Sequence, residues 1–220
     1  MCKIIIVLMV RIEPFEKYSG QYEAWFDTNA PVYQSELKAL RKLLPRSRNS
    51  VEIGVGSGRF AVPLGIRRGL EPSASMARIA QQRGIRVDQG ICERLPYEDS
   101  QFDLVLMVTT LCFLDDVVQS FREVHRILMK SGWLVIGFID KNSSLGKLYR
   151  EYSNTNVFYS VADFYSLEEI TRLLLQNGFG HLQFVHTISR PVEDIDDTEP
   201  ALEGYGTGSF VVIRAMKQVI

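Results

Sequence analysis

Cysteine is scarce in this sequence, and the few cysteines present limit the chemistry that it can carry. Cys2, Cys92 and Cys112 lie far apart and form no C-x-x-C pair. An odd number of scattered cysteines argues against a disulfide framework and against a structural zinc site. We therefore expect a protein without a bound metal, in the reducing environment of the cytoplasm.

An excess of charge of either sign is also missing. The 220 residues hold 25 Lys and Arg against 26 Asp and Glu, which gives a formal net charge of −1. Proteins that bind nucleic acid or an anionic membrane surface usually carry a basic excess or patch. The composition therefore gives no electrostatic support for either partner.

Hydrophobic runs are too short to cross a membrane. The run at the start, residues 4–10, holds seven consecutive apolar residues, whereas a transmembrane helix needs about 20. It resembles the apolar part of a signal peptide, but Arg11, Glu13 and Glu16 follow without a small-residue cleavage site. We expect an extended N-terminal segment and no targeting signal.

What the sequence does contain is a regular alternation of short apolar runs and longer amphipathic stretches. The amphipathic stretches Ser73–Arg83 and Asp116–Lys130 predict helices. This alternation predicts an α/β fold with a parallel sheet and helices on both faces. The buried strands are expected at Ser50–Ile53, Gly69–Glu71, Ile85–Val87, Phe102–Val108 and Trp133–Asp140.

Further elements are expected on both sides of this core. Asn29 and Pro31 suit the start of a helix that ends at Pro45, and Ser166-x-x-Glu169 is a capping box for a late helix. The final strands, His181–Ser189 and Ser209–Met216, predict an antiparallel pair joined by a long, solvated acidic loop. Residues 60–66 alternate like a strand and contain Pro63, yet the crossover to the next parallel strand favours a short, distorted helix.

The stretch SVEIGVGSGRF, residues 50–60, places three glycines directly after the first strand. A triphosphate loop would need a lysine after the last glycine, and a dinucleotide loop would need glycine where Arg59 stands. Glu52 would also repel a pyrophosphate. S-adenosylmethionine carries no phosphate, and its ammonium and sulfonium groups are attracted to carboxylates. Glu71, at the end of the second strand, can accept hydrogen bonds from ribose hydroxyls, as it would in nicotinamide-dependent oxidoreductases.

Four ordered segments make the chain similar to the class I SAM-dependent methyltransferases, especially the small soluble type that acts on small molecules. The segments are EIGVGSG, GLEPS followed by Met76, QGICERLPYEDSQFDLV, and FREVHRILMKSGWLVIG. The likeness covers about residues 33–140. It implies a Rossmann-like three-layer sandwich whose seven-stranded, mostly parallel sheet ends in an antiparallel hairpin. Residues 1–45 would supply an N-terminal segment with lid or packing helices, and residues 46–220 the cofactor-binding part of one structural domain.

The resemblance also implies roles for individual residues in binding S-adenosylmethionine. The methionine part of the cofactor would contact Glu52, Gly54, Gly56 and Gly58, and Glu71 would hold the ribose. The residues implied around the adenine and the reactive methyl group are Pro72, Ser73, Met76, Gly90, Ile91, Cys92, Glu93, Thr109, Thr110 and Leu111.

Two departures from the family pattern bear on the acceptor and the cofactor. Many relatives place an aspartate where Ile91 stands, so backbone groups or Glu93 would have to bind the adenine amino group. The stretch VTTLCFLDD, residues 108–116, lacks the Asn/Asp-Pro-Pro-Tyr/Phe signature of enzymes that methylate amino groups of DNA. The resemblance thus favours a small-molecule acceptor, with a nicotinamide-dependent oxidoreductase and a non-catalytic SAM-binding protein as alternatives.

Two aromatic clusters flank these motifs. The spacing of the first in steps of three and four residues fits a packed helix face and a lid over the cofactor equally well. We expect its Tyr18 to contact the methionine end of the cofactor. This first cluster consists of Phe15, Tyr18, Tyr22, Trp25, Phe26 and Tyr33. The second cluster, Tyr149–Tyr165, is expected to line the acceptor site, where an amine would gain cation–π attraction. We assign structural roles to His125, His181 and His186, and no catalytic residue.

Overall fold

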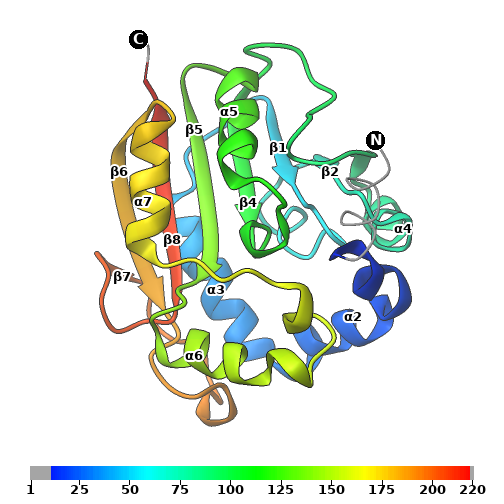
Figure 1. Ribbon diagram of the computed structural model, residues 1–220, viewed down its shortest axis with the longest axis vertical. Helices are drawn as coiled ribbons and strands as arrows, with labels where there is room; N and C mark the ends of the chain where they lie inside the picture. Colours follow the sequence, from blue (N-terminus) through cyan, green and yellow to red (C-terminus); the bar gives the residue numbers. More distant parts are fainter. Residues whose placement is uncertain (1–10, 219–220) are drawn as a thin grey trace.

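The computed structural model describes residues 11–218, and its centre is an eight-stranded sheet (Figure 1). The strand order is β3-β2-β1-β4-β5-β8-β6-β7, with β8 antiparallel to both β5 and β6. This confirms the parallel core and the reversed final pair. The strands are β1 (Ser50–Ile53), β2 (Arg68–Leu70), β3 (Arg86–Asp88), β4 (Phe102–Val108), β5 (Leu128–Ile139), β6 (Phe179–Thr187), β7 (Leu202–Glu203) and β8 (Phe210–Lys217).

The eighth strand is the one that the sequence did not predict. β7 has two residues, and it pairs at the edge of the sheet with Val185 and His186 of β6. It lies in the acidic loop that was expected to be solvated throughout. Glu199 of that loop is buried instead, because its carboxylate accepts bonds from the Ser189 amide at 2.6 Å and from Arg190 Nε at 2.9 Å.

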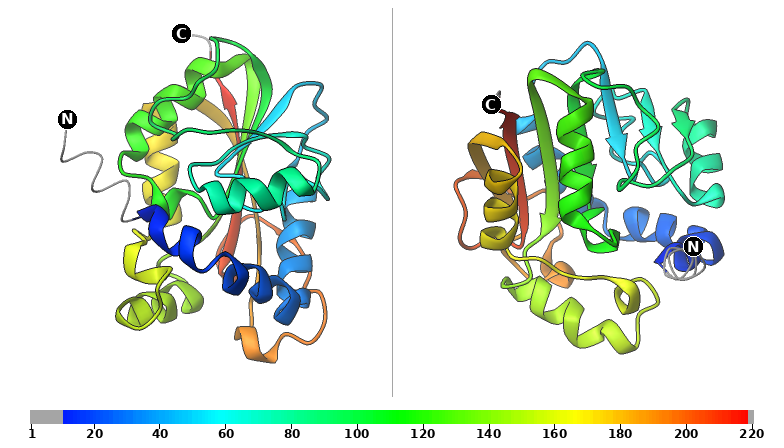
Figure 2. Two further views of the ribbon diagram at one scale, coloured as in Figure 1. Left: turned by 90° about the vertical axis from the view of Figure 1, so that its right-hand side faces the viewer. Right: turned by 45° about the horizontal axis from the view of Figure 1, so that its top comes forward.

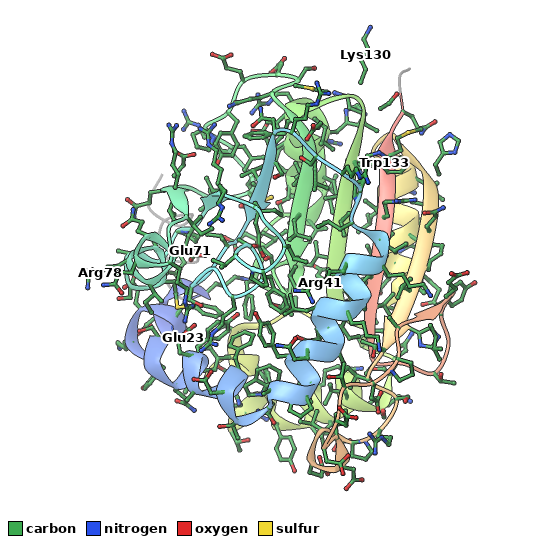
Figure 3. All side chains as sticks on the ribbon, turned by 180° about the vertical axis from the view of Figure 1, so that it is seen from behind. Glu23, Arg41, Glu71, Arg78, Lys130 and Trp133 are labelled. Carbon is green, nitrogen blue, oxygen red and sulfur yellow. The ribbon has the colours of Figure 1, made fainter. Side chains whose placement is uncertain are left out.

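Helices cover both faces of the sheet, as expected for three layers. α5 (Val117–Ile127) and α7 (Leu167–Gln176) pack on the face that is turned to the viewer in Figure 1. α3 (Ala30–Leu43) covers the opposite face, where it contacts β5, β6 and β8 (Figure 3). α4 (Ala74–Gln82) contributes Ala80 to the core on the α3 side.

The helix termini follow local sequence signals. Ser73 and Asp116 accept side-chain bonds from the amides of Met76 and Gln119, and the capping box of Ser166 and Glu169 is complete. Asn29 is different: its side chain donates to the Trp25 carbonyl at 2.9 Å, so it ends α2 (Ser19–Thr28) and does not cap α3.

α5 ends at Ile127, three residues before the predicted end at Lys130. Leu128 already pairs with Phe102 of β4, and the register shifts between Phe102 and Leu104. Ser131 takes a left-handed φ of 57° in this irregular part of β5. The Ser131-Gly132 pair therefore marks a strand irregularity and not the helix end.

The segment after the glycines, residues 57–65, folds as a series of turns, so the expected short helix is wrong. Pro63 has no amide hydrogen to give to the carbonyl of Arg59 in a helix. The Tyr33 hydroxyl donates to that carbonyl instead. A side chain of α3 thus replaces the helical bond that proline removes.

Residues 11–17 are helical, and with α2 and α6 (Ser144–Glu151) they lie beyond the carboxyl ends of the parallel strands (Figures 1 and 2). Four short 3-10 turns complete the chain: η1 (Leu111–Phe113), η2 (Tyr152–Asn154), η3 (Tyr159–Val161) and η4 (Val192–Asp194). Among residues 11–218, no helix combines the length and apolar character needed to cross a membrane. The predicted extended segment before Arg11 lies outside the described residues.

Candidate active site

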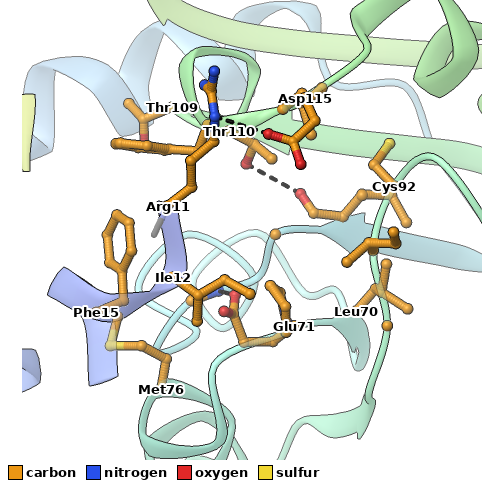
Figure 4. Close-up of a pocket in the computed structure, with 18 of the residues that line it drawn as sticks. Arg11, Ile12, Phe15, Leu70, Glu71, Met76, Cys92, Thr109, Thr110 and Asp115 are labelled. Carbon is orange, nitrogen blue, oxygen red and sulfur yellow. Dashed lines mark hydrogen bonds and ion pairs between the residues drawn. The ribbon is translucent and has the colours of Figure 1, made fainter. Parts of the chain in front are cut away.

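A cavity of about 100 Å³ opens where β1, β2 and β4 end, and we call it the glycine-turn cavity (Figure 4). Open α/β sheets bind their ligands at this edge. Its walls come from segments that are far apart in the chain: residues 11–22, 53–56, 70–76, 90–93 and 108–115. The fold thus brings together the glycine turn, the end of β2, the loop after β3 and the loop after β4.

The glycine turn needs glycine for both conformation and space. Gly54, Gly56 and Gly58 have φ values of 69°, 55° and 84°, in the left-handed region. A Cβ on Gly54 would lie 2.5 Å from Cγ2 and Oγ1 of Thr110, which is far inside van der Waals contact. Gly58 faces α4, since a Cβ there would lie 3.6 Å from Ala80. The first glycine therefore fits against β4, and the third lets α4 approach.

Glu71 ties the glycine turn to the end of β2. Its carboxyl oxygens accept hydrogen bonds from the Gly56 amide at 2.8 Å and the Ser73 amide at 2.9 Å. The residue is only 6% exposed, and burial raises the pKa of its carboxyl to about 7. No cation among the described residues pairs with it. The carboxyl is thus held in place at the cavity wall.

Glu52 is a second acid at the same place, and it is more deeply buried. It is 1% exposed, and its Oε2 has no hydrogen-bond partner among the described residues. Burial, and then the nearby Glu71 charge, raise the pKa of Glu52 well above its ordinary value. Two buried carboxyls without a protein cation create a site that favours a positively charged ligand and disfavours a phosphate.

The helical residues 11–17 close one side of this cavity and are held at both of its rims. Arg11 forms ion pairs with Asp115 at 2.9 Å and with Asp163 at 2.6 Å. On the opposite rim Glu16 accepts a bond from the Ser75 hydroxyl at 2.7 Å, at the start of α4. The segment therefore bridges the cavity as a lid would.

A second cavity, of about 200 Å³, adjoins the first, and we call it the aromatic cavity. The two cavities share Phe15, Tyr22, Thr109 and Phe113. Twelve aromatic side chains line the second: Phe15, Tyr22, Trp25, Phe26, Phe60, Phe113, Phe138, Tyr149, Phe158, Tyr159, Phe164 and Tyr165. Both predicted aromatic clusters therefore converge on one space, next to the end of β4.

Comparison with known proteins gives a consistent result. The methyltransferase domain family matches residues 51–136. An uncharacterized protein of Methanocaldococcus jannaschii is 41% identical over 92% of this chain and 98% of its own. A Thermotoga maritima crystal structure, described as a SAM-dependent methyltransferase and possible histamine N-methyltransferase, matches with a TM-score of 0.92 at 46% identity, covering 94% of this chain and all of that one.

The chain belongs to the SAM-dependent methyltransferases. Its cofactor is S-adenosylmethionine. A more distant protein, phosphoethanolamine N-methyltransferase 2 of Haemonchus contortus, has the same fold and was solved with S-adenosylhomocysteine. It matches with a TM-score of 0.63 at 15% identity, over 84% of this chain and 53% of that one. The nicotinamide-dependent oxidoreductase, which the sequence left as an alternative, is set aside.

Most predicted cofactor residues of the methyltransferase lie around the glycine-turn cavity. Leu111 lines the aromatic cavity instead, whereas Glu52, Gly58 and Ser73 line neither cavity. Their contacts with the cofactor stay predictions. The predicted residues that line the glycine-turn cavity are Gly54, Gly56, Glu71, Pro72, Met76, Gly90, Ile91, Cys92, Glu93, Thr109 and Thr110.

Tyr18, which was predicted to contact the methionine end of the cofactor, does not line the cofactor site. It is 43% exposed, sits between residues 11–17 and α2, and lines neither cavity. Tyr22, one turn later, lines both. The two tyrosines belong to the same aromatic series, but Tyr18 has non-helical backbone (φ −119°, ψ 29°) at the start of α2, whereas Tyr22 lies within the helix.

The sequence did not single out two residues of the site. Arg11 lines the glycine-turn cavity, and Glu36 lines the aromatic cavity. Arg11 gives no local signal, because its partners Asp115 and Asp163 are about 100 and 150 positions away. Glu36 did give a signal: it follows Tyr33 by three residues and precedes Leu40 by four, on the buried face of α3. A carboxyl on such a face is the kind of buried polar group that needs explanation.

Replacing Glu52 by glutamine will stabilise the fold at neutral and alkaline pH. The pKa of Glu52 is raised in the folded state, so the folded chain keeps a proton that the unfolded chain loses above about pH 4. Stability from this group therefore falls as pH rises, by about 1.4 kcal/mol per pKa unit crossed. We expect the E52Q melting temperature to exceed that of wild type at pH 8 and to match it near pH 4.

Asp103 provides a control of opposite sign. Hydrogen bonds from the Ser47 hydroxyl and the amides of Arg48 and Asn49 hold the pKa of Asp103 below its ordinary value, against burial. Asp103→Asn will therefore lose stability at neutral pH, and the loss will vanish as the pH falls through that lowered pKa. Equal pH profiles for E52Q and wild type would show that Glu52 is not buried as described.

Proposed function

We propose that this methyltransferase transfers the methyl group of S-adenosylmethionine to a small-molecule acceptor held in the aromatic cavity. The observation that carries the proposal is the contact between the two cavities, which share Phe15, Tyr22, Thr109 and Phe113. A donor in the first cavity and an acceptor in the second would face each other at the end of β4. The aromatic walls suit a small, flat or cationic molecule.

The residues around the glycine-turn cavity fit this cofactor. Gly54 lets the turn pack closely against Thr110, and Gly56 keeps the cavity wall free of a side chain. Glu71 presents carboxyl oxygens to a ribose, and Glu52 adds a second buried carboxyl that a nearby positive charge would help to ionise. When bound, the cofactor supplies an already activated methyl group on a positively charged sulfur. These residues need only bind and orient it, because alignment of reactants can account for much of the rate enhancement.

The protein contributes alignment and exclusion of water to the transfer. Thr109 stands at the junction of the cavities, with a left-handed φ of 50° that fixes the end of β4. Arg11 holds the lid segment against the loop after β4. Shielding from water prevents competing hydrolysis and strengthens electrostatic contacts. Among residues 11–218, no histidine lines either cavity.

The Thermotoga protein, described as a possible histamine N-methyltransferase, makes amines the first class of acceptor to test. The proposal involves neither nucleic acid nor membrane as partner, since the chain carries no excess of positive charge. It places the enzyme in the cytoplasm on the basis of the unpaired cysteines.

The test is turnover with a broad panel of small acceptors. Purified protein is incubated with S-adenosylmethionine and with separate amines, alcohols, thiols and phenols, and S-adenosylhomocysteine is measured by mass spectrometry. We expect product above the acceptor-free blank for at least one member. Tight binding of S-adenosylhomocysteine with no turnover of any member would favour a non-catalytic SAM-binding protein.

A further inference from the structure

The side chain of Glu36 is almost buried, and its carboxyl opens onto the aromatic cavity without a partner from the described residues. Glu36 lies on α3, is 5% exposed and lines the cavity. Among residues 11–218, it forms neither a hydrogen bond nor an ion pair. A carboxyl in such an apolar place is costly to ionise without a partner, so its presence calls for a reason.

The neighbouring residue shows that this part of α3 can satisfy its polar groups. The Ser35 hydroxyl donates to the Pro31 carbonyl at 2.7 Å and accepts from the Glu199 amide at 2.8 Å. Glu36, next to it, faces the aromatic cavity and receives nothing. Polar groups in this part of α3 therefore find partners within the fold, and only the carboxyl that faces the cavity lacks one.

Glu36 is also the only acidic or basic residue among the described residues that line this cavity. Burial raises the pKa of its carboxyl to about 8. Burial also raises the pKa of Tyr149 and Tyr159, two tyrosines that line the same cavity as Glu36. The rings lie 4.2 Å apart between centroids and are stacked.

We propose that Glu36 is the anion that recognises the positively charged nitrogen of an amine acceptor, with the aromatic faces around it supplying cation–π attraction. Carboxylate and aromatic rings together form the usual environment for an organic cation. This inference rests on the proposed function, because it takes the aromatic cavity as the acceptor site. To the proposed function it adds that the acceptor is positively charged and that Glu36 is the residue that binds this charge.

The position of Glu36 also indicates which part of the acceptor it holds. It lines the aromatic cavity but not the glycine-turn cavity, whereas Thr109 lines both. An ammonium group bound to Glu36 has no free electron pair with which to attack. The acceptor is therefore a small amine with a second, uncharged nucleophilic atom, which would lie nearer to Thr109. Glu36 is a binding residue in this account and not a base.

The experiment compares matched cations and neutral molecules on protein saturated with S-adenosylhomocysteine. The probes are 2-phenylethylamine against 2-phenylethanol and tryptamine against tryptophol, with dissociation constants from calorimetry. Wild type is expected to prefer at least one amine by about tenfold or more, the usual worth of a charge-assisted bond. In E36Q this preference is expected to shrink to about twofold or less, while affinity for S-adenosylhomocysteine is unchanged.

Two further variants separate recognition from folding. Glu36→Asp keeps the charge and is expected to retain a preference for amines. Asp27→Asn removes an exposed carboxylate of α2 that pairs with Arg59 and lines neither cavity, and its preference is expected to equal that of wild type. An unchanged preference in E36Q, or wild type that binds neither amine, would overturn the inference. Failure of wild type to bind S-adenosylhomocysteine would instead contradict the proposed function.

Discussion

Replacing Glu71 by alanine will weaken the binding of S-adenosylhomocysteine by about 5- to 150-fold. Loss of a charge-assisted hydrogen bond costs about 1–3 kcal/mol, and each 1.4 kcal/mol is tenfold in affinity. The variant also releases the Gly56 amide, which donates to Glu71 at 2.8 Å, so the glycine turn loses its anchor. Calorimetric titration of wild type and variant measures the change directly.

Asp88 serves as the matched control for this prediction. It lies at the end of β3, one strand farther out at the same edge of the sheet, and pairs with Arg68 at 2.7 Å. Asp88 does not line the glycine-turn cavity, so Asp88→Ala is expected to bind S-adenosylhomocysteine like wild type. If both variants bind as wild type does, the ribose is held elsewhere.

Replacing Gly54 by alanine will destabilise the protein by a few kcal/mol and abolish measurable binding of the cofactor. The new Cβ would lie 2.5 Å from two side-chain atoms of Thr110, and the residue would keep a φ of 69°. Overpacking costs about 1–3 kcal/mol, and left-handed strain in a non-glycine residue adds about 1 kcal/mol. Denaturant unfolding and cofactor titration report the two effects separately.

The variant Gly65→Ala separates the cost of a left-handed backbone from the cost of the steric clash at Gly54. Its φ is 77°, yet a Cβ there would meet nothing within 4 Å. Gly65→Ala should therefore show the conformational cost alone, and cofactor affinity should be unchanged. Thr110→Ala in the Gly54→Ala background should restore part of the stability, because it removes the two nearest atoms. Equal destabilisation by G54A and G65A would show that Gly54 is not packed against Thr110.

The fold was largely predictable because its signals are local. The parallel core follows from alternating apolar runs, and the caps at Ser73, Asp116 and Ser166 lie within three residues of the groups that they bind. Errors arose where distant contacts decide. Leu128 joins β5 because Phe102 pairs with it, and the carbonyl of Arg59 is satisfied by Tyr33 across the molecule.

The sequence predicted the glycine turn of the site and the aromatic character of the second cavity, but not the charged residue Glu36 that lines it. Gly54, Gly56 and Glu71 belong to compact motifs, so a resemblance transfers them directly. The aromatic cavity instead combines residues from 15 to 165 in the chain. No motif joins Glu36 to Tyr149 and Tyr159, which line one cavity because α3 and the segment after β5 both reach this edge of the sheet. Arg11 joins Asp115 and Asp163 for the same reason.

The most direct test of this account is a crystal structure of the protein with S-adenosylhomocysteine. We predict both ribose hydroxyls within hydrogen-bonding distance of the Glu71 carboxyl, the amino-acid end beside Gly54 and Gly56, and the sulfur turned toward the aromatic cavity that Glu36 lines. Ligand bound away from the glycine turn, or sulfur facing solvent on the side opposite the aromatic cavity, would contradict it.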